Sequence, residues 1–284
     1  MDSVEILEQG DLRLDKFRAP DGKLYLYDIQ ASQHHSFSVE GYLVHNCSMV
    51  DERVGKDLLS FGCKVLVLGD PFQLPPIYGG GFFTDAEPDV VLTEVHRQAL
   101  DNPILHLATE LRQTGCLPRQ HPLLVKSLTP DMALAVDQLI VGRNRTRRAC
   151  NRRMRALLGR ESEFPEPGDK VVCLRNNHDL GLLNGATYIV TRSRQNGAGL
   201  ELKLDEDLEV LVHPEPFLGG DVEWWREREA EKFDYGYALT CHKSQGSQWD
   251  KVGVIDESRA FGAHAARWLY TAVTRAAKEL WVKT

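Results

Sequence analysis

The class of the fold can be inferred from one stretch of the sequence, Lys64-Val65-Leu66-Val67-Leu68-Gly69-Asp70-Pro71-Phe72-Gln73-Leu74-Pro75-Pro76. Its first five residues are typical of a strand in a parallel sheet that helices cover on both faces. Further strands are expected at residues 90–92, 138–141, 237–239 and 252–255, with helices between them, the first over residues 52–61. This alternation predicts an α/β fold built on a parallel sheet.

The composition is that of an ordinary globular protein with about two domains. The chain has 284 residues, 42% hydrophobic and 26% charged. No apolar run in the sequence approaches the roughly 20 residues of a membrane span, and the charged first residues do not resemble a signal peptide. Six scattered cysteines without a CxxC pair argue against a zinc site or disulfide framework and favour a reducing cytoplasm. The net charge of −7 argues against coating nucleic acid by bulk charge but leaves room for a local basic groove.

Two regions have a different texture from the α/β part. Residues 168–209 contain short strands at 171–174, 187–191 and 200–204, separated by Asn-Gly turns, which predicts a small β-barrel inserted into the second α/β domain and returning near Phe233. β-like runs at residues 3–7, 23–29 and 36–44 predict a short all-β leading segment.

Several polar residues follow predicted strands, where ligands bind in open α/β sheets. Gln73, after the strand that runs into Gly69 and Asp70, has the donor and acceptor groups to sense a terminal phosphate. Arg97 follows another strand, and Arg275 lies in a stretch, residues 269–276, that we interpret as an interior helix. Converging on a phosphate, the two would act as arginine fingers, although each taken singly is more often a surface ion-pair residue.

The densest polar run after a strand spans residues 240–249. Hydroxyl, imidazole, amide and ammonium groups of this kind suit contacts to a nucleic-acid backbone. They belong to Thr240, His242, Lys243, Ser244 and Gln245.

In this order, the stretches resemble superfamily 1 DNA helicases of the RecD-like and Dda-like branch. Residues 69–76 look like motif III, 97–98 like motif IV, 240–246 like motif V and 270–275 like motif VI, while 168–185 are similar to the SH3-like insert of that branch. The resemblance implies RecA-like sheets that use ATP and Mg²⁺ and move on single-stranded DNA. It assigns ATP contacts to Gln73, Arg97 and Arg275, in a site that includes Gly69 and Asp70, and coupling to DNA to residues 242–245. Gln248 departs from the glutamate common near that position, which puts a contact there in doubt.

The leading segment ends in Val44-His45-Asn46-Cys47, which carries self-cleavage chemistry. The Asn46 side chain can attack its own carbonyl carbon and break the chain after itself, and a neighbouring imidazole such as His45 speeds such a step about 10²–10⁴-fold. Cys47 would then be a competent acyl acceptor. By itself, the tripeptide is more simply an exposed turn.

Upstream positions change that weighing, because together they resemble the C-terminal splicing blocks of inteins. These positions are Tyr27-Asp28-Ile29, His35, Phe37 and Gly41. The resemblance makes Asn46 the cyclising residue, His45 its catalyst, Asp28 and His35 supporting residues of the upstream block, and Cys47 the first extein nucleophile. The expected partner is a separate polypeptide that carries the N-terminal half and an intein N-fragment. A truncated fragment of a contiguous intein is the alternative.

No GxxxxGK[ST] phosphate loop occurs in the sequence. In relatives, the Mg²⁺-binding Asp-Glu pair precedes a stretch like Cys47-Ser48-Met49-Val50-Asp51, so that pair is expected at the end of the partner polypeptide. We therefore expect ATP hydrolysis only after joining. The rival hypotheses are a non-splicing, two-chain complex and an inactive fragment.

The expected organisation is an intein segment at 1–46, the end of a first RecA-like domain at 47–115, a second at 116–164 and 233–284, and the SH3-like insert at 165–232. Residues 143–155 hold seven arginines, which fit a phosphate-tracking helix and a solvated helix face equally well. Trp224, Trp225 and Trp249 are suited to stacking on bases, but packing in a core or interface is the favoured interpretation.

Overall fold

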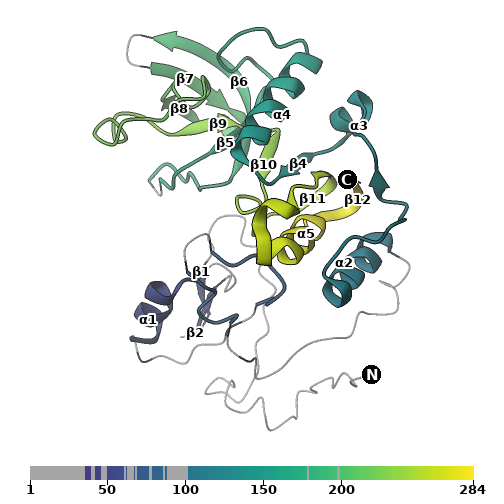
Figure 1. The fold of residues 1–284 in the computed structure, drawn as a ribbon. Coiled ribbons are helices and arrows are strands. Elements are labelled where there is room, and N and C mark those ends of the chain that lie inside the picture. The colour runs from purple at the N-terminus through teal and green to yellow at the C-terminus, as the bar shows by residue number, and fades with distance from the viewer. Residues whose placement is uncertain are drawn as a thin grey trace.

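The computed structural model describes residues 36–39, 42–45, 50–60, 62, 67, 69–76, 79–85, 87, 102–177, 179–196 and 199–284. Within these ranges lie a parallel sheet with its helices, an antiparallel sheet, and a hairpin near helix α1 (Glu52–Ser60), as Figure 1 shows. The predicted α/β fold with a parallel sheet is confirmed.

The parallel sheet has five strands in the order β10-β4-β11-β12-β3, and every neighbouring pair is parallel. The strands are β3 (Leu124–Val125), β4 (Gln138–Val141), β10 (Ala238–Thr240), β11 (Trp249–Ile255) and β12 (Ala276–Lys283). All four residues of β4 are buried, as expected of a central strand covered on both faces.

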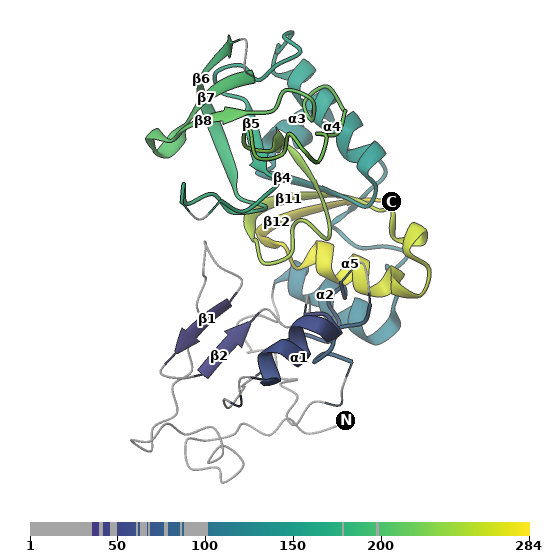
Figure 2. The same ribbon diagram turned by 90° about the vertical axis from the view of Figure 1, so that its left-hand side faces the viewer.

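Helices lie on both faces of this sheet (Figure 2). Leu139 of β4 packs with α3 (Pro130–Ala135) and α4 (Asn144–Leu157), whereas Ile140, the next residue, packs with α2 (Pro103–Thr114) and α5 (Ala265–Val273). Successive side chains of a strand point to opposite faces, so β4 joins two separate hydrophobic cores.

The antiparallel sheet, in the order β8-β7-β6-β5-β9, is inserted between α4 and β10. Its strands are β5 (Lys170–Cys173), β6 (Thr187–Asn196), β7 (Gly199–Leu204), β8 (Glu209–Val212) and β9 (Phe233–Tyr235). A short 3₁₀ helix (Asp205–Asp207) joins β7 to β8. The two edges of this sheet meet, because the chain just before β9 is hydrogen-bonded to the end of β8. The Glu231 backbone oxygen accepts from His213 N (3.0 Å), and the Glu231 N–H donates to Leu211 O (2.8 Å). The insert therefore closes on itself.

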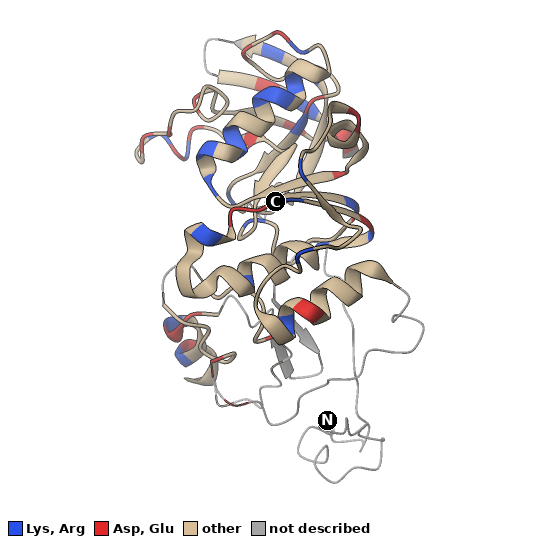
Figure 3. Cartoon of the chain, turned by 45° about the vertical axis from the view of Figure 1, so that its right-hand side comes forward, with Lys and Arg blue, Asp and Glu red and all other residues tan. Residues whose placement is uncertain are grey.

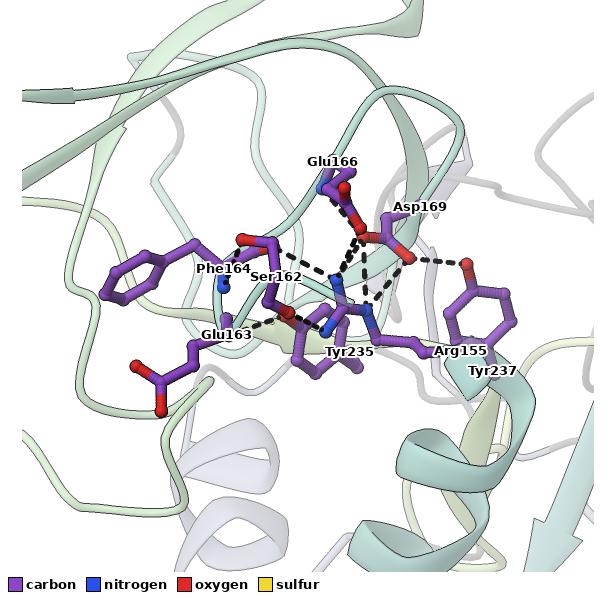
Figure 4. Close-up of polar contacts among 8 residues, drawn as sticks. All are labelled: Arg155, Ser162, Glu163, Phe164, Glu166, Asp169, Tyr235 and Tyr237. Carbon is purple, nitrogen blue, oxygen red and sulfur yellow. Dashed lines mark hydrogen bonds and ion pairs between the residues drawn. The ribbon is translucent and has the colours of Figure 1, made fainter. Parts of the chain in front are cut away.

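A buried polar cluster fixes α4 to the start of this insert (Figure 4). The Arg155 guanidinium pairs with the fully buried Asp169 carboxylate (3.1 Å) and lies over the Tyr235 ring, 4.4 Å from its centre. Asp169 also accepts from the Tyr237 hydroxyl (2.7 Å). On the same helix face, Asn151 bridges Tyr235 O and Ala238 N.

The helix termini follow local sequence rules. Asn102 caps α2 by accepting from Ile104 N (2.9 Å), and Gly115 ends it with a left-handed conformation at φ 73°. α4 has no side-chain cap of its own, and Glu257 supplies one by accepting from Gly142 N and Arg143 N. A 3₁₀ segment (Ser258–His264) follows Glu257 and leads into α5.

Most predicted elements in the described ranges are confirmed. The strand at 138–141 is β4, that at 252–255 lies within β11, and that at 237–239 is β10 shifted by one residue. The helix predicted at 52–61 is α1. The strands expected at 3–7, 23–29 and 90–92, and most of the strand at 64–68, lie outside the described residues.

The β-like run at 36–44 consists of two antiparallel strands, β1 (Ser36–Val39) and β2 (Tyr42–His45), on either side of the turn signal Glu40-Gly41. Two predictions need correction. The helix expected over 269–276 ends at Val273, because Ala276 already pairs with Trp249 in the sheet. Trp224 and Trp225 are 78% and 60% exposed, which excludes core packing for both, whereas Trp249 packs against the α2/α5 core.

No helix among the described residues has both the length and the apolar character to cross a membrane.

Candidate functional site

The turn at residues 69–76 is shaped by its own carboxylate. Asp70 accepts from Phe72 N through Oδ1 (3.0 Å), and its backbone oxygen accepts from Gln73 N (3.1 Å). The half-buried Gln73 amide has no hydrogen-bond partner within the described part of the chain. With respect to the described residues, the turn therefore presents an unengaged donor and acceptor at Gln73.

This turn is docked on α5 and on the segment after β10. Leu74 is buried; its N–H donates to Thr271 Oγ1 (2.8 Å), and its carbonyl accepts from Gln245 Nε2 (2.7 Å). The Tyr270 hydroxyl donates to Asp70 Oδ2 (2.7 Å), and burial together with this bond raises the pKa of Tyr270. Both Asp70 oxygens are thus used inside the protein.

Arg275 lies between α5 and β12, not inside a helix, and is 8% exposed. Its guanidinium donates to Thr271 O (3.0 Å), Ser247 O (3.1 Å) and Thr274 Oγ1 (3.2 Å). Burial lowers the pKa of Arg275, against the raising effect of Cys241, Tyr270 and Asp70. An arginine still keeps its proton in a protein, so this charge is buried and, among the residues described, no carboxylate lies within ion-pair distance of it.

Residues 240–246 form a tight turn after β10. Thr240 Oγ1 accepts from Lys243 N (3.4 Å), and Ser244, fully buried, donates its hydroxyl to Cys241 O (2.8 Å). Ser244 Oγ and Gln245 Nε2 thus have partners inside the protein, and the DNA contacts expected of this turn stay a prediction.

His242 and Lys243, like Thr240, are partly exposed. The His242 ring lies 5.7 Å from the Phe261 ring, and burial, helped by His264, lowers the pKa of His242. Lys243 Nζ donates to Asn184 of the insert, and burial lowers the pKa of Lys243 as well. The turn thus touches the insert on one side and, through Gln245, the 69–76 turn on the other.

The structure brings together Gly69, Asp70, Gln73, Gln245 and Arg275. It does not place the second predicted arginine finger or most of the cleavage residues, because Arg97, Asp28, His35, Asn46 and Cys47 lie outside the described residues. His45 is described only as the last residue of β2.

Sequence reasoning missed the contacts that hold the 69–76 turn in place. Thr271 lies four residues before Arg275, and that spacing on a helix end was the available signal. The Arg112 guanidinium, 4.5 Å from the centre of the Phe72 ring, carried no signal in the sequence.

The comparisons with known proteins agree with this geometry. A family model described as the UvrD-like helicase C-terminal domain matches residues 235–282, which include the 240–246 turn and Arg275. This part of the chain is thus similar to the C-terminal domain of UvrD-like helicases.

Among curated proteins, the chain is 28% identical over 290 residues to the ATP-dependent RecD2 DNA helicase of Deinococcus radiodurans, covering 89% of this chain and 38% of that protein. It is 26% identical over 257 residues to a probable conjugal transfer protein TraA of Sinorhizobium fredii, covering 78% of this chain and 22% of that protein. The chain thus spans well under half the length of these relatives.

Among solved structures, a Bacteroides Pif1 helicase in complex with ADP-AlF3 and ssDNA matches with a TM-score of 0.53 and 18% identity, covering 84% of this chain and 69% of that one. The Pif1 helicase of Candida albicans matches with a TM-score of 0.51 and 18% identity, covering 85% and 71%. At this identity the likeness shows the fold. None of these matches reports an intein.

Proposed function

We propose that the chain is the C-terminal part of an ATP-dependent helicase motor that moves on single-stranded DNA. The observation that carries the proposal is the buried Arg275 guanidinium, held by neutral oxygens beside the turn that presents Gln73. A buried cation without a carboxylate partner favours an anionic ligand, and a transferred phosphoryl group has the charge and the acceptor oxygens for it.

The same contacts support coupling between nucleotide and DNA. The Leu74–Gln245 hydrogen bond connects the Gln73 turn to the turn that carries His242 and Lys243. A movement of the 69–76 turn on phosphate release would therefore shift the 240–246 turn. In this proposal, Thr240, His242 and Lys243 contact the DNA backbone, and ATP supplies the phosphoanhydride bond.

The described residues account for only part of a nucleotide site. They contain no cluster of three or more His, Cys, Asp or Glu side chains able to hold a metal ion, and the sequence lacks a P-loop. We propose that a preceding half supplies the P-loop and the Mg²⁺-binding Asp-Glu pair, while Arg275 and Arg97 complete the site from this chain. The two sheets would then be RecA-like and SH3-like, with the predicted domain boundaries, in a cytoplasmic enzyme.

We further propose that residues 1–46 are an intein C-terminal segment that joins the two halves by trans-splicing. The support is the set of typed positions at fixed spacing, Asp28, His35, His45, Asn46 and Cys47. The junction falls where relatives carry the metal-binding pair, so splicing would complete the catalytic centre.

Phosphate release tests the motor proposal. The purified 284-residue chain is expected to show no DNA-stimulated ATP hydrolysis, and hydrolysis is expected once it is joined to an N-terminal half that carries a P-loop. Hydrolysis by the chain alone would contradict the proposal, as would an inert joined protein.

Tryptic mass spectrometry tests the splicing proposal. In the native source, peptides that end in Cys47-Ser48-Met49-Val50-Asp51-Glu52-Arg53 are expected to carry residues of the partner polypeptide before Cys47. In the variant Asn46→Ala, the same peptides are expected to remain joined to residue 46. If the wild-type protein yields only the unspliced peptide, the splicing proposal is wrong, and the remaining hypotheses are a two-chain complex and an inactive fragment.

A further inference from the structure

Helix α4 is the most basic element of an acidic chain. The chain carries 41 acidic and 34 basic residues, yet the α4 sequence NRTRRACNRRMRAL contains no acid at all. Figure 3 shows this helix with several blue segments and no red one. A helix face that only needs to be solvated usually mixes both signs, because like charges three or four residues apart repel.

Two arginines of this region have structural partners. Arg147 pairs with Asp234 (2.6 Å), and Arg155 pairs with Asp169; their side chains are 12% and 9% exposed. These contacts explain two of the seven arginines at residues 143–155.

The other five arginines are exposed: Arg143, Arg145, Arg148, Arg152 and Arg153. Within the described ranges, no acidic side chain lies within ion-pair distance of any of them. Two of the five, Arg143 and Arg145, also lie at the N-terminal end of α4, where the helix dipole disfavours positive charge. Repulsion among these arginines is therefore unfavourable for folding, and the packing of α4 does not explain why they are present.

Three of the exposed arginines form a row, which we call the α4 arginine row: Arg145, Arg148 and Arg152. Spacings of three and four place them on one side of the helix, over about 10 Å of its axis, a length that matches about three nucleotides of one B-DNA strand. Arg153 lies about 100° round the helix from Arg152, off the row. All three are arginine, whose planar fork suits phosphate oxygens.

The backbone that carries the row is held in place and borders the insert. Behind it, Asn151 and Arg155 fix α4 to the sheet and the insert. Beside it, a Cβ at Gly219 would lie 3.9 Å from a terminal nitrogen of Arg148. The helix therefore keeps the spacing of the three arginines, and only their side chains have to be ordered when a ligand binds.

We propose that the α4 arginine row binds the phosphodiester backbone of DNA, as a contact separate from the turn at residues 240–246. The ligand is a strand of regularly spaced phosphates, either single-stranded DNA or one strand of a duplex. The choice of DNA as the polyanion rests on the proposed function; the row itself goes beyond it, because that function does not use α4.

The test measures binding of the full chain to labelled 20-nucleotide DNA, single-stranded and duplex, by fluorescence anisotropy over a range of salt concentrations. Arg145→Gln/Arg148→Gln/Arg152→Gln is expected to weaken binding at least tenfold and to reduce the slope of log K against log salt by about 2 to 3. A loss limited to one form of DNA identifies that form as the ligand, and a loss for both identifies the backbone they share.

Matched variants remove charge elsewhere. Arg119→Gln/Arg194→Gln/Arg228→Gln removes the same three charges at other exposed arginines, and Arg153→Gln removes one charge on α4 itself, beside the row. Both are expected to leave the salt slope within about one of wild type, and replacement of the row by lysine is expected to restore most of it. Removing mutually repelling charges should not unfold α4, which thermal melting checks.

Equal losses in the row and control variants would overturn the proposal, as would equally strong competition by polyglutamate, which would point to an acidic protein. Because the experiment needs no ATP hydrolysis, its failure is distinguishable from failure of the motor proposal.

Discussion

Arg275 shows why arginine and lysine are not interchangeable at a buried site. Three donors of its guanidinium are engaged by Thr271 O, Ser247 O and Thr274 Oγ1. A guanidinium has five donors, so two remain for a ligand while the three fixed ones hold the plane in position. A lysine ammonium has three donors and would have to give up protein contacts to bind the same ligand.

Arg275→Lys is therefore expected to lower kcat of the joined enzyme by about 10³-fold or more while leaving DNA binding unchanged, as for other arginine fingers. Phosphate release under saturating ATP measures kcat. Arg119→Lys is the matched control at an exposed position. A change in KM alone would mean that Arg275 binds ATP without stabilising the transition state.

Lys170 makes stability depend on pH. Burial lowers the pKa of Lys170 from 10.5 to about 8, although the Asp137 charge acts in the opposite direction. Between these two values, the unfolded chain keeps a proton that the folded chain has lost, so the free energy of unfolding rises with pH through this window.

The expected rise, relative to Lys170→Met, is about 2 kcal/mol between pH 8 and pH 10.5, allowing for partial exposure of the ammonium. Urea denaturation of both proteins at several pH values measures it. A difference that stays flat over this range would contradict the lowered pKa.

At the scale of elements, the junction of α4 with the insert depends on one ion pair. Arg155 also donates to Ser162 O (2.6 Å) and Phe164 O (3.0 Å), so it gathers the chain between α4 and β5. Removal of the cation would leave the Asp169 carboxylate buried without its partner, which costs more than the pair itself contributes.

Arg155→Met is expected to lower the free energy of unfolding by about 3–5 kcal/mol. Arg155→Met/Asp169→Leu should recover a large part of that loss, and Arg152→Met, exposed on the same helix, should change stability by no more than about 0.5 kcal/mol. Urea denaturation with a double-mutant cycle measures these terms. An equal loss in the double variant would mean that packing, not charge, holds the junction.

The elements that the sequence predicted well are those decided by local pattern. In the stretch 138–141, Gln138 is followed by three apolar residues and then by Gly142, and the stretch is β4. β12 was missed because it begins with Ala276-Ala277-Lys278-Glu279, residue types that favour helices, and only pairing with Trp249 and its neighbours makes this segment part of the sheet. The short β3 depends in the same way on its partner Val282.

The candidate site was predictable by residue type but not by contact. Gln73 was singled out from its position after a strand, and Arg275 from a stretch interpreted as an interior helix. The inward use of Gln245, in contrast, depends on Leu74, 171 residues away. Long-range partners of this kind are set by tertiary packing, which no local pattern reports.

At the scale of the whole molecule, the 69–76 turn is fixed to the hydrophobic core formed by α2 and α5. Ties from Leu74 to Thr271, from Leu74 to Gln245 and from Asp70 to Tyr270 join chain segments separated by at least 171 residues. The coupling that we propose between the two turns depends on these hydrogen bonds.

Thr271→Val is expected to speed hydrogen exchange at least tenfold in peptides from residues 69–85, because a buried bond to the Leu74 amide is lost. Peptides from β5 to β8 should be unchanged. Thr191→Val, which removes an exposed hydroxyl bond to Lys203 O, is the matched control. Unchanged exchange at residues 69–85 would show that the turn is held without this bond.

The two ends of the insert lie next to each other in the α/β part, and this arrangement has a consequence for the evolution of the protein. Gly236 N donates to Lys170 O (2.8 Å), and Val171 pairs with Tyr235, so the two ends of a segment of about 65 residues lie side by side. Any module whose termini are equally close would fit at this point without stretching the host sheet. The junction is therefore a natural site for exchange of whole modules by recombination.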